Sequence, residues 1–148
     1  MMHATKIALL ASFILRPGNW DAQAEAWSRL IPHDWPGSHA DRLGEIVKSG
    51  SAECMDLSHS ESLERIGVLV YTVDRSFDLP EMVILAAYAG DPHYDITAHC
   101  LAELEASARS LGCATIRFHT MRPGLVRKSI RAGWRLSEAV MRKDIRHV

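Results

Sequence analysis

PEMVILAAYAGDPHYDITAHCLAELEASARSLG, residues 80–112, joins an apolar run to an amphipathic one. Its first part, EMVILAAYAG, has the length and composition of a buried strand. Its last part is typical of a helix that ends at Gly112. The joint between them, GDPHYD, holds two aspartates, although a strand leading into a helix N-terminus commonly binds phosphate. The helix stripe consists of Ile96, Cys100, Leu104, Ala108 and Leu111.

Before this segment, short apolar runs alternate with turn residues and helix signals. Residues 7–15 are interpreted as a buried strand. Asn19 is expected to cap a first helix, and Ser38 with Asp41 has the spacing of a capping box for a second helix that Gly50 closes. AECMDLS, GVLVYTVD and EMVILAAYAG are three strand-like runs separated by polar turns, which indicates an antiparallel meander.

After this segment, a strand, a short helix and a final strand complete the pattern. ATIRFHT alternates, with Arg117 and His119 on its polar side. Pro123 suits the first turn of a helix that Gly133 ends, and WRLSEAVMRKDI is expected to be the last strand. The predicted fold is one α/β domain over residues 1–148, ordered β-α-α-β-β-β-α-β-α-β on a mixed, mostly antiparallel sheet.

The composition is that of an ordinary globular chain. Its 148 residues are 47% hydrophobic with a formal net charge of -1, so neither nucleic acid nor an anionic membrane is the expected partner. No apolar run approaches the ~18 residues of a membrane span. KIALLASFIL is interpreted as a strand and not as a signal peptide, because Arg16 directly follows it. Cys54, Cys100 and Cys113 form no CxxC, which favours free thiols and a cytoplasmic location.

Two groups of side chains carry further expectations. The first lies on apolar stripes and is expected to be largely buried. The second lies on one short helix near the C-terminus, and is either a solvated face or a surface that docks an anion or a protein. The first group is Trp20, Trp27, Ile96, Leu104, Ile116 and Phe118, and the second is Arg122, Arg127, Lys128 and Arg131.

From Glu81 to Ile145, the order strand, long helix, LGCATIRFHT, short helix, AGW and final strand resembles the GCN5-related N-acetyltransferase (GNAT) superfamily. The resemblance implies that the fourth strand splays away from the fifth. It implies that the exposed backbone of the fourth strand, here Leu85, Ala86 and Ala87, holds the pantetheine arm of acetyl-CoA. It also implies acetyl transfer to an amine of a small molecule or a protein.

The same resemblance assigns roles to individual residues. Glu81 corresponds to the family's glutamate base, and the backbone N–H of Leu85 to the amide that polarises the thioester. Ser129 stands where the family has a tyrosine that protonates the leaving thiolate, and a serine hydroxyl is a much weaker acid. Glu81 and Ser129 are therefore the candidate catalytic residues.

The family's diphosphate pattern, Q/R-x-x-G-x-G/A, falls on Pro92, Asp95, Thr97 and Ala98. Neither glycine is present, and a carboxylate faces the expected diphosphate. Two like charges about 4 Å apart repel by roughly 4 kcal/mol at an effective dielectric near 20. We therefore expect Asp95 to cap the long helix itself, and the affinity for acetyl-CoA to be weak or absent.

Two classes of function follow from this pattern. One is an N-acetyltransferase with a degenerate cofactor loop. The other is a catalytically inactive GNAT-like protein with a protein partner or a structural role, since HTMRPGLVRKSIRAGW is also similar to GNAT-like proteins of tailed phages, some of them virion components. A homo-oligomer fits either class. No metal site is expected, because the crowded group Asp91, His93, Asp95, His99 and Cys100 lacks zinc-motif spacing.

Overall fold

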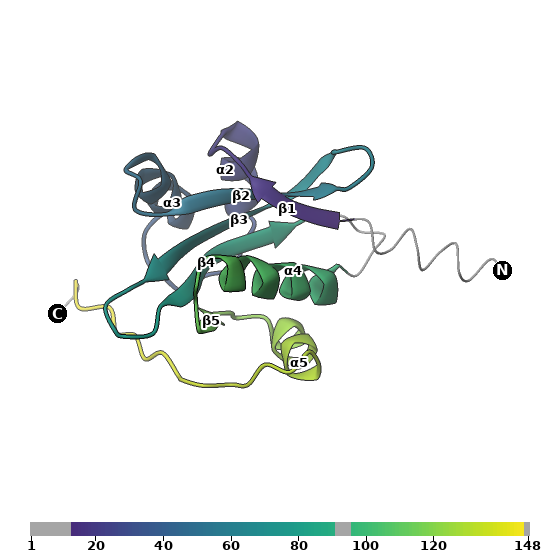
Figure 1. Cartoon of the computed structure of the whole chain (residues 1–148). Coiled ribbons are helices and arrows are strands. Elements are labelled where there is room, and N and C mark those ends of the chain that lie inside the picture. The colour runs from purple at the N-terminus through teal and green to yellow at the C-terminus, as the bar shows by residue number, and fades with distance from the viewer. Residues whose placement is uncertain (1–12, 91–95, 147–148) are drawn as a thin grey trace.

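The structure is a computed structural model that describes residues 13–90 and 96–146. A five-stranded sheet with the order β1-β2-β3-β4-β5 forms its centre (Figure 1). The first four strands are antiparallel to their neighbours, and β5 is parallel to β4. The strands are β1 (Phe13–Pro17), β2 (Glu53–His59), β3 (Arg65–Asp74), β4 (Glu81–Ala89) and β5 (Thr115–Phe118). The predicted meander and the predicted mixed sheet are confirmed.

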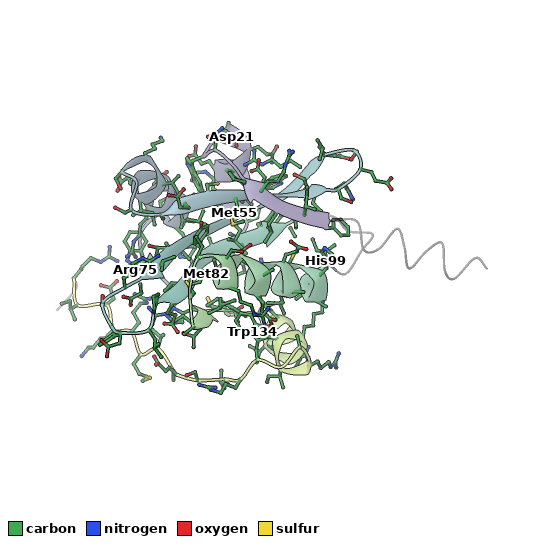
Figure 2. All side chains as sticks on the ribbon, in the orientation of Figure 1. Asp21, Met55, Arg75, Met82, His99 and Trp134 are labelled. Atoms are coloured by element: carbon green, nitrogen blue, oxygen red, sulfur yellow. The ribbon has the colours of Figure 1, made fainter. Side chains whose placement is uncertain are left out.

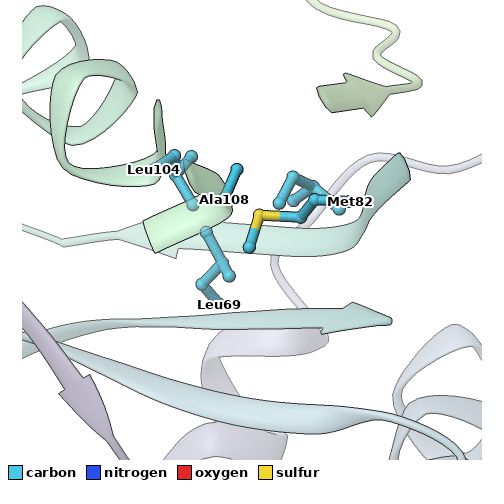
Figure 3. Close-up of a cluster of buried hydrophobic side chains, with 5 residues drawn as sticks. Leu69, Met82, Leu104 and Ala108 are labelled. Carbon is cyan, nitrogen blue, oxygen red and sulfur yellow. The ribbon is translucent and has the colours of Figure 1, made fainter. Parts of the chain in front are cut away.

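Helices cover both faces of this sheet. α2 (Ala22–Ser28) and α3 (His39–Lys48) lie on one face, α4 (Thr97–Ser110) lies on the other, and α5 (Pro123–Arg131) follows β5 (Figure 1). Leu104 of α4 packs on Leu69 and Met82 from the sheet (Figure 3). On the opposite face, Leu43 of α3 packs on Val70. The result is one three-layered α/β domain with a core on each side of the sheet.

The N-terminal ends of α2 and α3 show which of the predicted capping residues cap a helix. Ser38 caps α3, since its Oγ accepts a hydrogen bond from the backbone N–H of Asp41 at 3.2 Å, as the capping-box spacing predicts. Asp21, and not Asn19, caps α2: its Oδ1 accepts from the N–H of Ala24 at 2.8 Å. A carboxylate at this position also interacts favourably with the helix dipole, which accounts for the two-residue difference.

A β-bulge interrupts β4 at Leu85. The pairing with β3 passes from Val70–Ala86 directly to Tyr71–Ile84, so Leu85 is an extra residue on its strand. Side chains two residues apart in a regular strand lie on the same face of the sheet. One extra residue between them places them on opposite faces. Before the bulge, Ile84 packs on the α4 side, and after it Ala86 packs on the α3 side.

The predicted last strand is wrong. The chain from Trp134 to Ile145 has no regular secondary structure in the described part of the protein, and Figure 1 shows it leaving α5 as an extended segment. A two-residue period would place Leu136 and Val140 on one side of such a strand, and Met141 and Ile145 on the other. The segment pairs with no described strand, since β5 is the last strand of the described sheet, and its apolar side chains therefore remain exposed.

The expected buried set is only partly correct. Ile96 and Leu104 are buried, which confirms those two assignments. Ile116 and Phe118 are partly buried because β5 is an edge strand with no strand beyond it in the described sheet. The remaining two, Trp20 and Trp27, are also partly buried. Among the helices of residues 13–90 and 96–146, none is long and apolar enough to cross a membrane.

Candidate functional site

The strands β4 and β5 pair over only part of their length. Their parallel register runs from Glu81–Thr115 to Ile84–Phe118 and stops there. β4 continues to Ala89, paired on its other side with β3. From Leu85 onwards, the β5-facing side of β4 therefore has no strand partner among the described residues, which confirms the predicted splay. We refer to this opening as the slot.

Leu85 lies where the slot begins. The bulge omits it from the register with β3, and the register with β5 has already ended at Ile84. Leu85 is thus the one residue of β4 without a register partner in either neighbouring described strand. A bulge of this kind commonly re-aims backbone groups beside a functional site. Neither neighbouring described strand pairs with this position, and the slot begins here.

Beyond β5, the chain leads into α5 through a short loop. His119 is the first residue after Phe118, so it follows the last paired position of β5. One residue further along begins a groove of about 410 Å³. Arg122 and Arg127 make this groove cationic, and it lies at the N-terminal end of α5, where the helix dipole also favours anions. Its lining residues are Thr120, Met121, Arg122, Pro123, Val126 and Arg127.

Glu81 lies at the start of β4, and both of its carboxylate oxygens have partners. Oε2 accepts a hydrogen bond from the hydroxyl of Thr115 at 2.8 Å, and Oε1 lies 3.3 Å from Nε of Arg117. Glu81 and Leu85 are four positions apart, which is about 13 Å of extended chain. The carboxylate therefore lies at the closed end of the β4–β5 pair, bound by Thr115 and Arg117 and away from the start of the slot.

The contacts of Ser129 are those of a residue that stabilises α5. Its side chain is buried, and its hydroxyl donates to the carbonyl of Leu125 at 2.7 Å, one turn earlier in α5. Its own carbonyl accepts from the backbone N–H of Trp134 at 3.0 Å. The hydroxyl hydrogen is thus engaged inside the helix, and the residue terminates α5 through its backbone.

The loop that precedes α4 carries the predicted diphosphate residues. Pro92 and Asp95 lie outside the described residues, so the prediction that Asp95 caps the helix lies there too. α4 itself begins at Thr97, and Ile96 in the N-cap position makes no side-chain capping hydrogen bond. Ala98 in the first turn is exposed.

One turn into α4, His99 anchors the helix to the sheet. Its Nε2 lies 2.6 Å from the carbonyl oxygen of Phe13 in β1 (Figure 2 labels His99). Three of the five residues in the crowded acidic group, Asp91, His93 and Asp95, lie outside the described residues. Within the part of the chain that the structure describes, no three His, Cys, Asp or Glu side chains come close enough to hold a metal ion.

An ion-pair network fixes α2 on the sheet beside the slot. Arg65 of β3 lies 2.7 Å from Asp21 and 2.8 Å from Asp56, and its guanidinium covers the ring of Trp27 at 5.3 Å. Trp27 in turn stacks on Tyr88 of β4 at 6.0 Å. Tyr88 lies beyond the bulge, in the part of β4 that has no β5 partner. This network therefore fixes the side chain on the α2 side of that part of the strand.

The two aspartates of this network respond to it differently. Burial raises the pKa of Asp21, but the Ala24 amide and Arg65 lower it by more, and the net pKa is below its ordinary value. Burial raises the pKa of Asp56, and its ion pair with Arg65 does not fully offset that effect. Although Arg65 Nε and Asp56 Oδ1 are close, neither atom has a well-directed hydrogen bond, so their pairing is weaker than the distance suggests.

The three cysteines are free thiols, as their spacing predicts. Burial raises the pKa of the Cys54 thiol to about 11 and that of Cys100 to about 12. A thiol acts as a nucleophile only as the thiolate. Cys54 and Cys100 are therefore core residues without the properties of a covalent catalyst.

The sequence did not indicate His119 as a candidate base or Tyr88 as a wall of the site. In the sequence, His119 is only the residue that follows a short strand, and its significance depends on where the β4–β5 pairing stops. Tyr88 depends on the bulge, which turns its side chain toward Trp27. Neither property follows from a local motif.

Comparison with known proteins supports the fold. No protein-family model matches the sequence, and no curated protein matches it. Solved structures match over most of the chain, each with 90% of this chain and 99% of its own length aligned. An acetyltransferase from Trypanosoma brucei is 15% identical with a TM-score of 0.61, and a GNAT family acetyltransferase from Staphylococcus aureus is 19% identical with a TM-score of 0.59.

A third match, glucosamine-6-phosphate N-acetyltransferase from Arabidopsis thaliana, is 13% identical with a TM-score of 0.58. At these identities the likeness establishes the architecture. The chain has the fold of the GNAT acetyltransferases.

Proposed function

We propose that this protein is an N-acetyltransferase that uses acetyl-CoA. The observation that carries the proposal is the slot: β4 loses its β5 partner at the residue where a bulge also removes its β3 partner. A strand with free backbone groups can bind an amide-containing chain by adding hydrogen bonds to it. The GNAT fold of the chain supports the same assignment.

The described residues fit this cofactor. The backbone of Leu85, Ala86 and Ala87 would hold the two amides of a pantetheine arm along the slot. Arg122 and Arg127 in the groove beside it would attract the phosphates, which offers an anionic ligand a cationic surface on the α5 side. When bound, acetyl-CoA supplies an acetyl thioester, whose oxygen the N–H of Leu85 would polarise.

Transfer requires the neutral amine to attack the thioester carbon. A carbon–nitrogen bond then forms, the carbon–sulfur bond breaks, and the amine proton goes to a base. His119 is our candidate for that base, because it follows the last paired residue of β5 and so lies at the start of the slot. Glu81 would act only through intervening water, because its carboxylate is bound by Thr115 and Arg117.

The leaving thiolate needs less assistance than the amine. A thiol with a pKa near that of cysteine, about 8.5, leaves readily near neutral pH. Ser129 is not assigned as the acid, because its hydroxyl already donates to Leu125. Water at the slot mouth can therefore protonate the departing sulfur.

Calorimetric titration with acetyl-CoA tests this proposal directly. Because both glycines of the diphosphate pattern are absent, we expect weak binding by the parent protein, and release of free thiol when an amine such as glucosamine 6-phosphate or a lysine peptide is added. Leu85→Pro removes the N–H at the bulge, where proline is tolerated in a strand, and should abolish transfer. Leu85→Val retains the N–H and serves as the matched control.

Circular dichroism melts show whether Leu85→Pro still folds. If it does not fold, His119→Gln provides the second test, with a lowered turnover at unchanged acetyl-CoA affinity as the expected result. Absence of acetyl-CoA binding by the folded parent protein would refute the proposal and leave a GNAT-like binding domain.

A further inference from the structure

The exposed side of β5 carries a row of polar residues. Ile116 and Phe118 pack against the buried cluster on the α4 side of the sheet. Because side chains alternate along a strand, Thr115 and Arg117 lie on the opposite face, which also carries α2 and α3. The alternation of exposed and half-buried residues continues through His119, which is exposed. We refer to Thr115, Arg117 and His119 as the β5 row.

Glu81 holds Arg117 in the middle of this row. Oε1 of Glu81 lies 3.3 Å from Nε of Arg117, and Oε2 accepts the hydrogen bond from Thr115 at 2.8 Å. The side chain of Arg117 is still 45% exposed. A guanidinium that is bound at Nε keeps the N–H donors of its two Nη groups for another partner. Within the described residues, neither Nη group of Arg117 has one.

The nearby carboxylates do not occupy the Nη side of Arg117. Asp74 pairs with Glu81 across the β3–β4 register, and its Oδ1 accepts from the backbone N–H of Ser76 at 2.9 Å. Hydrogen bonds from Ser76 lower the pKa of Asp74, and the charge of Arg117 lowers it further. Asp74 is therefore bound within its own turn, and Glu81 contacts the guanidinium through Nε.

A guanidinium with free Nη groups binds carboxylates and phosphates well, because its parallel N–H donors match two oxygens of the anion. Surface arginines commonly have no ligand, but Arg117 lies two residues before His119 on the same exposed row. Residues two positions apart in an extended chain are about 7 Å apart. A molecule that presents an amine to His119 can therefore reach Arg117 with a second group about 7 Å away.

We propose that Arg117 selects the acceptor: the acceptor is an amine that also carries a carboxylate or a phosphate, which the Nη groups of Arg117 bind while the amine lies at His119. This inference rests on the proposed function, in which His119 is the candidate base. Glu81 then acts as a positioning residue, because it holds Nε and so fixes the direction of the Nη groups. An amine without an anionic group lacks the second contact.

Matched pairs of acceptors test the proposal. 5-Aminopentanoate and pentylamine differ by a carboxylate, and glucosamine 6-phosphate and glucosamine differ by a phosphate. In at least one pair, the parent protein should have a kcat/KM that is roughly tenfold higher for the anionic member, since a hydrogen bond to a charged group is of that strength. The pair that shows the preference identifies the anion. No preference in either pair would overturn the proposal.

Variants show whether Arg117 causes the preference. Arg117→Met should reduce the ratio of kcat/KM values to about one, and Arg117→Lys, which retains the charge but not the paired donors, should retain only part of the preference. Arg109→Met is the matched control, because Arg109 is an exposed arginine of α4 on the other face of the sheet. If Arg117→Met does not fold, Arg117→Lys alone decides. An unchanged preference in the folded variants would refute the role of Arg117.

Calorimetric titration of the acceptors separates this inference from the proposed function. Without acetyl-CoA, the anionic amine should bind more tightly to the parent than to Arg117→Met. Acetyl transfer with no difference between the paired acceptors would leave the proposed function standing and refute the selection by Arg117. Selective binding of the anionic amine with no acetyl transfer would refute the proposed function, while the contact of Arg117 with the anion would be confirmed.

Discussion

The two regions of this fold differ in how completely their side chains are buried. In the core region, formed by β1–β4 with α2, α3 and α4, side chains on both faces of the sheet are fully buried, such as Val70 on one face and Met82 on the other. In the edge region, formed by β5, α5 and residues 134–146, the only described residue that is buried is Ser129. The core region holds the fold together, and the edge region presents backbone, cations and apolar side chains to other molecules.

This difference separates stability from binding in the same chain. The slot lies at the boundary between the two regions, with a rigid wall from β4 and a less covered wall from β5 and α5. Substitutions in the core region should change the free energy of unfolding. Substitutions in the edge region should change affinities and leave folding almost unaffected.

Leu104→Ala should give the largest effect. The side chain is 5% exposed between α4 and the sheet, and its loss leaves a cavity that costs about 2–5 kcal/mol. Leu136→Ala, in the extended segment after α5, removes the same atoms from a side chain that is 77% exposed. Urea unfolding should show little change for Leu136→Ala. Equal losses for the two variants would break the comparison.

Arg65→Met should give the next largest effect. It removes the partner of Asp56 and Asp21 while retaining much of the side-chain volume, and loss of hydrogen bonds to charged groups costs about 1.5–3 kcal/mol. Arg29→Met is the control, because the ion pairs of Arg29 are exposed and such pairs contribute about 0.2–1 kcal/mol. Thermal melts of the two variants would contradict this ranking if Arg29→Met were the less stable.

Removing the groove cations should change binding and not stability. Arg122→Ala with Arg127→Ala should weaken acetyl-CoA binding by about threefold to tenfold, with a smaller difference in high salt because the contact is charged. Arg29→Ala with Arg109→Ala removes the same net charge from α2 and α4 ends and is the control. Identical affinities for the two double variants would show that α5 does not contact the phosphates.

The smallest effect concerns pH. Because the folded pKa of Asp21 lies below its ordinary value of 3.8, its ionised form stabilises the fold above that pH, and the contribution is lost as pH falls through the folded pKa. Asp21→Asn retains a capping side chain but not the charge. Its unfolding free energy should therefore decrease less than that of the parent between pH 5 and pH 3. A steeper decrease would reverse the assigned sign.

Local chemistry predicted most of the fold. The capping box at Ser38, the proline at the start of α5 and the apolar runs of β2–β4 are all determined by neighbours in sequence, and each element formed as expected. Asn19 and Asp21 are both good capping residues, so the sequence alone does not distinguish them. Only the packed structure shows that Asp21, which caps the helix, also contacts Arg65. The prediction of the last strand failed because an apolar pattern shows that a segment could form a strand, but not that a neighbouring strand will pair with it.

The site was less predictable than the fold. Leu85 was placed at the slot by resemblance, but the bulge that isolates it depends on the register between two strands. Glu81 and Ser129 have the expected positions in sequence, yet their hydrogen bonds to Thr115 and Leu125 come from tertiary packing and helix geometry. His119 gains its significance only from where β5 stops pairing.

The bulge at Leu85 constrains the number of residues in β4 more strictly than their identities. Replacing Ile84 or Ala86 by another apolar residue changes one contact, whereas deleting Leu85 would leave those two residues as consecutive members of a regular ladder with β3. Tyr88 would keep its place against Trp27, but β4 would lose the one residue that neither neighbouring described strand pairs, and with it the start of the slot. The sheet would survive such a deletion and the site would not, so the length of this strand reflects binding and not the needs of the fold.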